Sequence, residues 1–167
     1  MKAGTWRVDP ARSIVEVSIR HLGVATVKGT FADLEAQLEV SEDGSLGVRA
    51  SIGTASLATG DGSRDEFLAS PGFFNAAKHP RATFVAEGVS AADDRWTIPG
   101  TLTIAGTSAP LELEVETAGD AEEPVLSVRG ELDRQAFGLR FPQAAGAGDA
   151  VVAKKVRLSA AVALSSP

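Results

Sequence analysis

The fold is decided by the stretch LELEVE at residues 111–116. Its apolar side chains alternate with three carboxylates, and a period of two is typical of a β-strand with one buried face and one face in water. Outward from this stretch, the same period predicts further strands at residues 15–20, 27–40, 46–52, 82–86, 96–104, 126–132 and 152–164. Together these segments predict an all-β fold, an eight-stranded antiparallel β-barrel.

Three segments depart from this alternation. In the second strand the apolar residues change parity near Ala32–Asp33, which predicts a bulge or bend there. A short helix is predicted between the third and fourth strands, at residues 61–70, because Asp61 or Ser63 can cap its first amides and Pro71-Gly72 ends it. The Gly- and Ala-rich residues 142–149 predict a loop before the last strand.

Length and composition limit the function classes. A chain of 167 residues predicts one domain spanning residues 1–167, and the absence of cysteine excludes disulfides and thiol chemistry. The net charge of −6, without a cluster of Lys and Arg, argues against a nucleic-acid partner. There is no apolar run long enough for a membrane span or a signal peptide, so a cytoplasmic protein is expected.

The interior of an eight-stranded barrel is just wide enough to be filled by side chains or to hold one small ligand. Seven Phe and two Trp are the only aromatic residues of the chain. Many positions on the inner parity are small: Gly29, Ala36, Ala50, Ala82, Ala86, Gly100, Gly130 and Ala160. Two interpretations follow, a partly hollow apolar lumen and a lumen in which larger neighbours fill the space.

Basic residues interrupt the apolar parity of three strands. His21, Arg134 and Lys154 each continue the inner face of their own strand. Because a charge inside a barrel is costly unless it is paired or hydrated, these side chains could meet at a barrel mouth and bind an anionic head group. The alternative is that each emerges at the rim, or that a bulge turns it outward. Arg64 also has two interpretations. It could form a charge pair with Asp65 that locks the helix to the barrel, or it could contribute to an anion site.

No group of residues in the sequence predicts a catalytic site. The two histidines lie 58 residues apart and no carboxylate has metal-ligand spacing, so no metal site is predicted. A nucleophile elbow and a glycine-rich phosphate loop are also missing. We therefore predict no catalytic residue and no cofactor, except that an isoprenoid lipid or quinone could be bound.

A series of short motifs covers almost the whole chain. In order they are Asp9-Pro10-x-x-Ser13, Ser18-Ile19-Arg20-His21-Leu22, Val27-Lys28-Gly29-x-Phe31, Ala55-Ser56-Leu57-x-Thr59-Gly60, Arg64-Asp65-x-x-Leu68, Phe73-Phe74-Asn75, His79-Pro80 with Phe84, Gly100-x-Leu102-Thr103-Ile104-x-Gly106-Thr107 and Asp133-Arg134-x-x-Phe137-Gly138-Leu139. In these motifs and their order, the chain resembles the YceI-like family of lipocalin-like, polyisoprenoid-binding proteins.

The resemblance implies that the protein binds, and carries or stores, a long apolar lipid in its lumen. The implied ligands are a polyisoprenoid, a prenyl pyrophosphate or an isoprenoid quinone. Carried over by motif position, the head group is expected at His21, Arg64 and Arg134. The apolar tunnel is expected at Val17, Ile19, Phe31, Leu38, Ile52, Leu68, Phe73, Phe74, Phe84, Leu102, Ile104, Leu113 and Leu132.

Two other functions stay open at this point. One is a barrel enzyme, a cyclase or isomerase acting on a polyene or polyketide-like substrate, with His21 or an inner carboxylate as general acid or base. The other is a barrel with a packed lumen that acts through its acidic outer faces. A homodimer is open too. An enzyme is the less favoured reading, because no catalytic constellation supports it.

Overall fold

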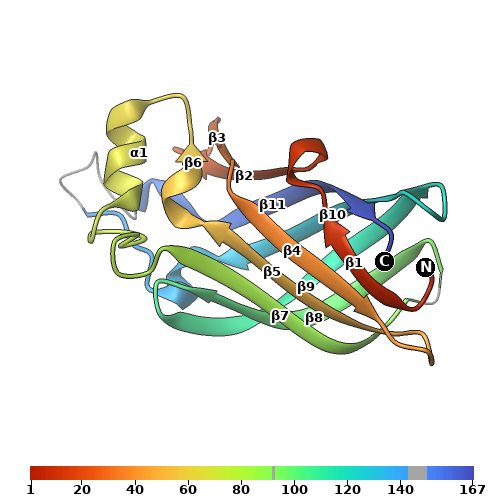
Figure 1. Ribbon diagram of the computed structural model, residues 1–167. Helices are drawn as coiled ribbons and strands as arrows, with labels where there is room; N and C mark the ends of the chain where they lie inside the picture. The colour runs from red at the N-terminus through yellow and green to blue at the C-terminus, as the bar shows by residue number, and fades with distance from the viewer. Residues whose placement is uncertain (92, 143–149) are drawn as a thin grey trace.

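The computed structural model describes residues 1–91, 93–142 and 150–167, and these form a β-barrel with one short helix (Figure 1). The strands are β1 (Gly4–Val8), β2 (Ile14–His21), β3 (Ala25–Phe31), β4 (Leu34–Val40), β5 (Ser45–Gly53), β6 (Leu57–Ala58), β7 (Arg81–Ser90), β8 (Arg95–Ile104), β9 (Thr107–Gly119), β10 (Pro124–Asp133) and β11 (Val152–Ser165). The helix is α1 (Gly62–Ala69). The loop predicted over residues 142–149 lies outside the described residues except for Pro142.

Eight strands form the closed antiparallel ring in the order β1-β4-β5-β7-β8-β9-β10-β11. The ring closes because β1 pairs with β4 on one side and with the end of β11 on the other, where Val8 lies opposite Leu164. The earlier part of β11 pairs with β2 instead, and β3 and β6 follow beside β2. The eight-stranded antiparallel barrel is therefore confirmed, and the β2–β3–β6 sheet extends it beyond the ring.

The strand that closes the ring is one that the alternation did not predict. β1 is five residues long, and the 3₁₀ turn Pro10–Arg12 separates it from β2. The side chain of Asp9 caps this turn by accepting a hydrogen bond from the amide of Ala11 at 2.9 Å. The turn lets one N-terminal segment pair twice with the long strand β11, first as β1 and then as β2.

The parity change near Ala32–Asp33 marks a real break in the sheet. β3 ends at Phe31 and β4 begins at Leu34, and the two parts have different neighbours. β3 pairs with β2 and β6, whereas β4 pairs with β1 and β5. The predicted bend therefore carries the chain from the extension into the ring.

The strand over residues 111–116 has the two faces that its alternation predicts. Leu111, Leu113 and Val115 are buried in the barrel, and the three glutamates that alternate with them are exposed. In the register of β8 and β9, Leu113 lies opposite Ile98, another buried residue. Apolar side chains thus meet across neighbouring strands on the inner face.

The helix α1 lies at the end of the barrel opposite the two chain termini (Figure 1). Asp61 caps it by accepting from the amide of Arg64 at 3.1 Å, so of the two predicted caps it is Asp61 that acts. The helix ends before Pro71-Gly72, as predicted. Within the described residues, α1 is the one α-helix, and it is too short to cross a bilayer.

Candidate functional site

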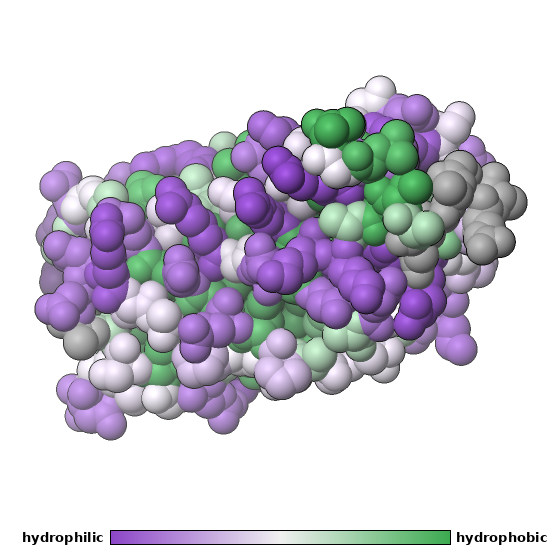
Figure 2. Space-filling model, turned by 180° about the vertical axis from the view of Figure 1, so that it is seen from behind, coloured by the Kyte–Doolittle hydropathy of each residue, from purple (hydrophilic) through white to green (hydrophobic). Residues whose placement is uncertain are grey.

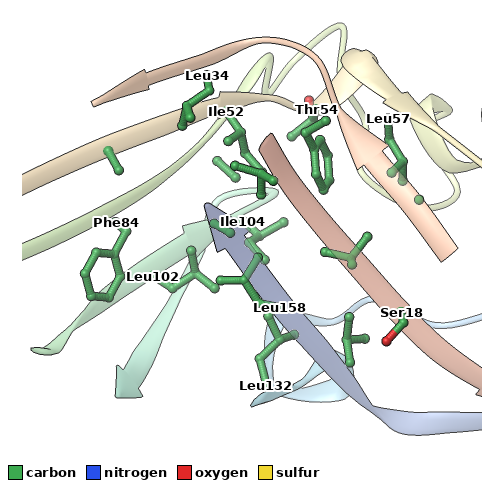
Figure 3. A pocket seen from close by; sticks show the side chains of 18 of the residues that line it. Ser18, Leu34, Ile52, Thr54, Leu57, Phe84, Leu102, Ile104, Leu132 and Leu158 are labelled. Carbon is green, nitrogen blue, oxygen red and sulfur yellow. The ribbon is translucent and has the colours of Figure 1, made fainter. Parts of the chain in front are cut away.

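An apolar cavity of about 610 Å³ occupies the interior of the barrel. Its wall includes residues from almost every strand, from Val8 of β1 to Leu164 of β11. In Figure 3 the side chains of Leu102 and Ile104 from β8, Leu132 from β10 and Leu158 from β11 project toward one another, with Phe84 and Leu57 at opposite sides of the view. The volume lies within the range of roughly 300–1,000 Å³ that is usual for small-molecule sites.

Every residue predicted for the apolar tunnel contributes to the wall of this cavity. These residues are Val17, Ile19, Phe31, Leu38, Ile52, Leu68, Phe73, Phe74, Phe84, Leu102, Ile104, Leu113 and Leu132. They come from β2, β3, β4, β5, β7, β8, β9 and β10, from α1, and from the segment that follows α1. The structure thus brings them together around one space, while a contact with a ligand stays a prediction.

The small inner residues explain why this space is not filled. Five of them line the cavity: Gly29, Ala36, Ala50, Ala82 and Ala160. Larger neighbours cover some of the small residues, because a Cβ on Gly100 would collide with the ring of Phe84 and a Cβ on Gly130 would lie 2.7 Å from Leu113. Gly29 lines the cavity and is also covered, since a Cβ there would lie 2.6 Å from Leu57. Small inner residues therefore border the hollow lumen at some positions and are covered by larger side chains at others.

Large side chains close the barrel at the end near the termini, which we call the floor. Trp6 is fully buried there, in one cluster with Leu46, Val89 and Trp96. The indole nitrogen of Trp6 donates to the carbonyl oxygen of Lys2 at 2.9 Å. Trp96 also lines the cavity, so its ring separates the empty lumen from the packed floor.

The cavity opens between β3 and the first turn of α1. Of the described lining residues, only Lys28, Asp61 and Ser63 are exposed to solvent. Lys28 lies on β3, and Asp61 and Ser63 lie at the N-terminus of α1. We call this opening the mouth.

Thr59 fixes α1 beside the mouth. Its hydroxyl donates to Asp65 at 2.5 Å and accepts from Nε of Arg64 at 2.8 Å, and its amide also donates to Asp65, at 3.0 Å. A second guanidinium nitrogen of Arg64 donates to the Thr59 carbonyl oxygen at 2.9 Å. The predicted lock therefore exists, but both charged residues act through Thr59, and no direct pair between them is seen.

Two of the predicted head-group residues reach the cavity wall near the mouth. Arg64 lines the cavity and is half-buried. His21 lines it from the last position of β2, opposite Ala25 of β3 and Val152 of β11. Both side chains can thus approach a polar group that lies where the lumen meets water.

Arg134 also borders the cavity, but its surroundings are different. It is 1% exposed, and its guanidinium donates to the carbonyl oxygens of Ala153, Leu139 and Val152 at 2.8–2.9 Å. It also stacks over the ring of Phe141 at 4.9 Å. These contacts give Arg134 a structural role, joining the segment after β10 to the start of β11, and a contact with a head group stays a prediction.

Lys154 does not join the site. The register of β11 against β2 shifts between Val152 and Val156, and Lys154 within this bulge is exposed. The expected alternative, a bulge that turns the side chain outward, is what the structure shows. The parity signal was misleading here because one added residue reverses the faces of a strand.

Few titratable side chains line the described part of the cavity. The titratable lining residues are His21, Lys28, Asp61, Arg64 and Arg134. Asp61 is the one carboxylate among them, and it caps α1 at the mouth, so no described carboxylate lies deeper in the lumen. Nor do His, Asp and Glu side chains gather into a metal-binding group within the ranges that the structure describes.

Sequence reasoning missed several lining residues. Thr54 is buried, lines the cavity and donates its hydroxyl to the carbonyl oxygen of His79 at 2.9 Å. Phe141 lines it too, with its ring centroid 4.9 Å from that of Phe73. Leu158 lies on the inner parity of β11, so alternation could have identified it. Thr54 and Phe141 lie in turns, where no periodicity indicates which side chains point inward.

Comparison with known proteins agrees with this architecture. The model of the YceI-like domain family matches residues 6–164. "Protein YceI" of Escherichia coli O157:H7 is 32% identical over 126 residues, which are 73% of this chain and 66% of that protein, so the match spans slightly less than two thirds of the relative.

Two solved structures share the fold. BcnA of Burkholderia cenocepacia has a TM-score of 0.82 at 23% identity, and the match covers 93% of this chain and 98% of that chain. A polyisoprenoid binding domain from Saccharophagus degradans, implicated in plant cell wall breakdown, has a TM-score of 0.74 at 13% identity, with 97% and 98% covered. At these identities the two structures establish the fold alone.

Proposed function

The chain belongs to the YceI-like domain family, and from this premise we propose that it binds a long apolar lipid of the polyisoprenoid class in its lumen and carries or stores it. The proposed ligands are a polyisoprenoid, a prenyl pyrophosphate or an isoprenoid quinone. The name of the domain from Saccharophagus degradans, which has the same fold, supports this class of ligand.

The observation that carries the proposal is the apolar cavity of about 610 Å³ that the side chains leave inside the barrel. Apolar side chains form nearly all of its wall, from the indole of Trp96 at the floor to Phe67 and Leu68 of α1 near the mouth. Each CH₂ group that leaves water for such a space contributes about 0.8 kcal/mol. Affinity therefore grows with chain length, and the wall selects for apolarity and length more than for a particular shape.

The polar residues around the mouth favour one orientation of the ligand. His21, Arg64 and the exposed Lys28 lie at or near the opening, whereas the floor consists of buried apolar side chains. An anionic or carbonyl-bearing head group is better solvated and better paired at the mouth. We propose that the head group lies at the mouth beside His21 and Arg64, with the prenyl chain directed toward Trp96.

Native mass spectrometry of the freshly purified protein tests the proposal, followed by organic extraction and identification of any released lipid. The protein is expected to carry one prenyl lipid per chain, or to take one up from solution. Leu132→Trp places an indole in the lumen and is expected to abolish the bound mass, because Leu132 is a half-buried lining residue.

The matched control is Val85→Trp. Val85 is 40% exposed and does not line the cavity, so the same substitution there should leave the bound lipid in place. An apo mass that persists after incubation with prenyl lipids and quinones would contradict the proposal. The cytoplasmic location and the homodimer stay predictions.

A further inference from the structure

The turn between β2 and β3 presents two apolar side chains to water. Leu22 is 61% exposed and Val24 is 88% exposed, and only Gly23 lies between them. We call residues 22–24 the tip. Figure 2 shows hydrophobic surface gathered at the end of the molecule away from the termini, the end where α1 lies. Two exposed apolar residues so close together at the end of a hairpin cost solubility, which suggests a binding role.

The tip has a defined conformation. The amide of Leu22 donates to the carbonyl oxygen of Val151 at 2.7 Å, and the amide of Val24 donates to that of His21 at 3.4 Å. Leu22 has a φ of +55°, in the left-handed region, where a leucine is strained and glycine or asparagine is favoured. A strained leucine that faces water does not improve the folded state, so its side chain is better explained by contact with a partner.

The tip lies beside the mouth. His21, the residue before the tip, lines the cavity, and Lys28, four residues after Val24, marks the opening. Both belong to the same pair of strands, in which Lys28 lies opposite Ser18, another lining residue. A surface that contacts the tip is therefore close to the entrance of the lumen.

The part of the β2–β3 hairpin that carries the tip is basic, whereas the chain as a whole is acidic. The mouth beside it adds the exposed carboxylate of Asp61. The net charge is −6, yet residues 17–31 contain no Asp or Glu and include Arg20 and Lys28. Lys154 is exposed in β11, close to where Val152 pairs with His21. Within the described part of the chain, none of these three cations forms an ion pair, whereas Lys155 and Arg157 both pair with Glu131.

Apolar side chains flanked by cations that form no ion pair with a described residue fit the surface of an anionic bilayer. The apolar groups enter the boundary between head groups and acyl chains, and each nearby Lys or Arg is attracted to the anionic lipids. A second copy of the chain fits less well, because a twofold contact of tips brings Arg20 and Lys28 near the same cations of the other copy.

We infer that the β2–β3 tip docks the mouth of the barrel on an anionic lipid bilayer, with Leu22 and Val24 in the interface and Arg20, Lys28 and Lys154 over the head groups. The docking itself needs no cargo, while passage of a lipid between bilayer and lumen rests on the proposed function. The docked orientation places the entrance of the lumen against the membrane that holds or receives the lipid.

Flotation of the full chain with vesicles tests the inference. Vesicles of phosphatidylcholine and phosphatidylglycerol at 7:3 are compared with vesicles of phosphatidylcholine alone, at low and at high salt. We expect binding to the anionic vesicles that weakens with salt. Val24→Ser should lower the partition coefficient about tenfold, and Lys28→Gln should lower it about fivefold.

Two further variants separate docking from folding. Leu22→Asn removes the apolar side chain but suits the left-handed backbone, so it should lose vesicle binding without losing thermal stability. Val85→Ser removes an exposed apolar side chain from the outer wall and should bind vesicles like the unchanged chain.

Failure of docking and failure of the proposed function are distinguishable. A chain that carries a prenyl lipid but does not bind anionic vesicles overturns the docking inference alone. A chain that binds anionic vesicles but takes up no prenyl lipid on incubation supports docking and counts against the lipid carrier. If the tip variants change the oligomeric state while vesicles are ignored, the tip is a contact between copies and the inference is wrong.

Discussion

The two ends of the barrel are built from the same kind of strand, yet one is packed and the other is hollow. At the floor, Trp6 and Trp96 fill the cross-section together with buried aliphatic residues. Toward the mouth, inner positions hold glycine and alanine, and a space of about 610 Å³ remains. Residue size on one parity of the strands therefore decides where the barrel is stabilised and where it can take a ligand.

The largest expected effect contrasts the floor with the wall of the lumen. Trp6→Ala should lower the free energy of unfolding by about 3–5 kcal/mol, because Trp6 is fully buried and closely packed. Leu132→Ala should cost only about 1–2 kcal/mol, because Leu132 already borders empty space and loses fewer contacts. Urea denaturation of both variants gives the comparison, and equal losses would contradict the idea of a hollow lumen.

Arg134 tests whether a cation on the cavity wall serves the fold or the ligand. Arg134→Met should lower the free energy of unfolding by about 3 kcal/mol, because it leaves three carbonyl oxygens without their donor. Arg64→Met should cost less, since Arg64 is only half-buried and the two guanidinium hydrogen bonds described above both go to Thr59. If Arg134→Met unfolds like the unchanged chain but loses an anionic lipid, Arg134 is a head-group residue.

Gly100 tests how closely the wall of the lumen is packed. Gly100→Ala should push the ring of Phe84 from its position and cost about 1–3 kcal/mol, because a Cβ there also lies 2.7 Å from the carbonyl oxygen of Val85. Since Phe84 lines the cavity, we expect lipid affinity to change together with thermal stability. Gly62→Ala, where a Cβ meets no atom within 4 Å, is the matched control; it should leave lipid affinity unchanged and should not lower thermal stability, because alanine is favoured over glycine in a helix.

The smallest expected effect concerns the lock at the mouth. Thr59→Val removes the hydroxyl that joins Arg64 and Asp65, and should cost about 1 kcal/mol and speed the release of bound lipid. Thr59→Ser keeps the hydroxyl and should release lipid like the unchanged chain. Stopped-flow transfer of a fluorescent prenyl lipid to acceptor vesicles measures both variants, and equal rates for Val and Ser would show that Thr59 does not restrain the mouth.

The sequence predicted most of this architecture because strand alternation is a local signal. It identified the strands from β2 to β11 except the two-residue β6, the break at residues 32–33, and the helix with one of its two candidate caps. It did not identify β1, where only five residues alternate before the turn at Pro10–Arg12. The closure of the ring by this short strand depends on pairing with β11, which is distant in sequence.

The tunnel residues could be predicted and the polar contacts could not. The alternation of apolar and polar residues and the family motifs predict which residues line the lumen, because burial follows the alternation. The partners of Arg134 include carbonyls of Val152 and Ala153 from another strand, and no local pattern indicates them. Lys154 was placed on the wrong face because the bulge in β11 leaves no mark in the alternation.

The dependence of affinity on ligand length tests the central claim most directly. Linear prenyl alcohols of increasing length are titrated into the protein while the fluorescence of Trp96, which lines the lumen, is followed. A Trp96→Phe variant identifies the signal that comes from this residue. We predict that affinity rises by about fourfold for each added CH₂ equivalent, until the lumen is full, and then levels off. An affinity that is independent of chain length, or a Trp96 signal that no prenyl alcohol changes, would contradict the account.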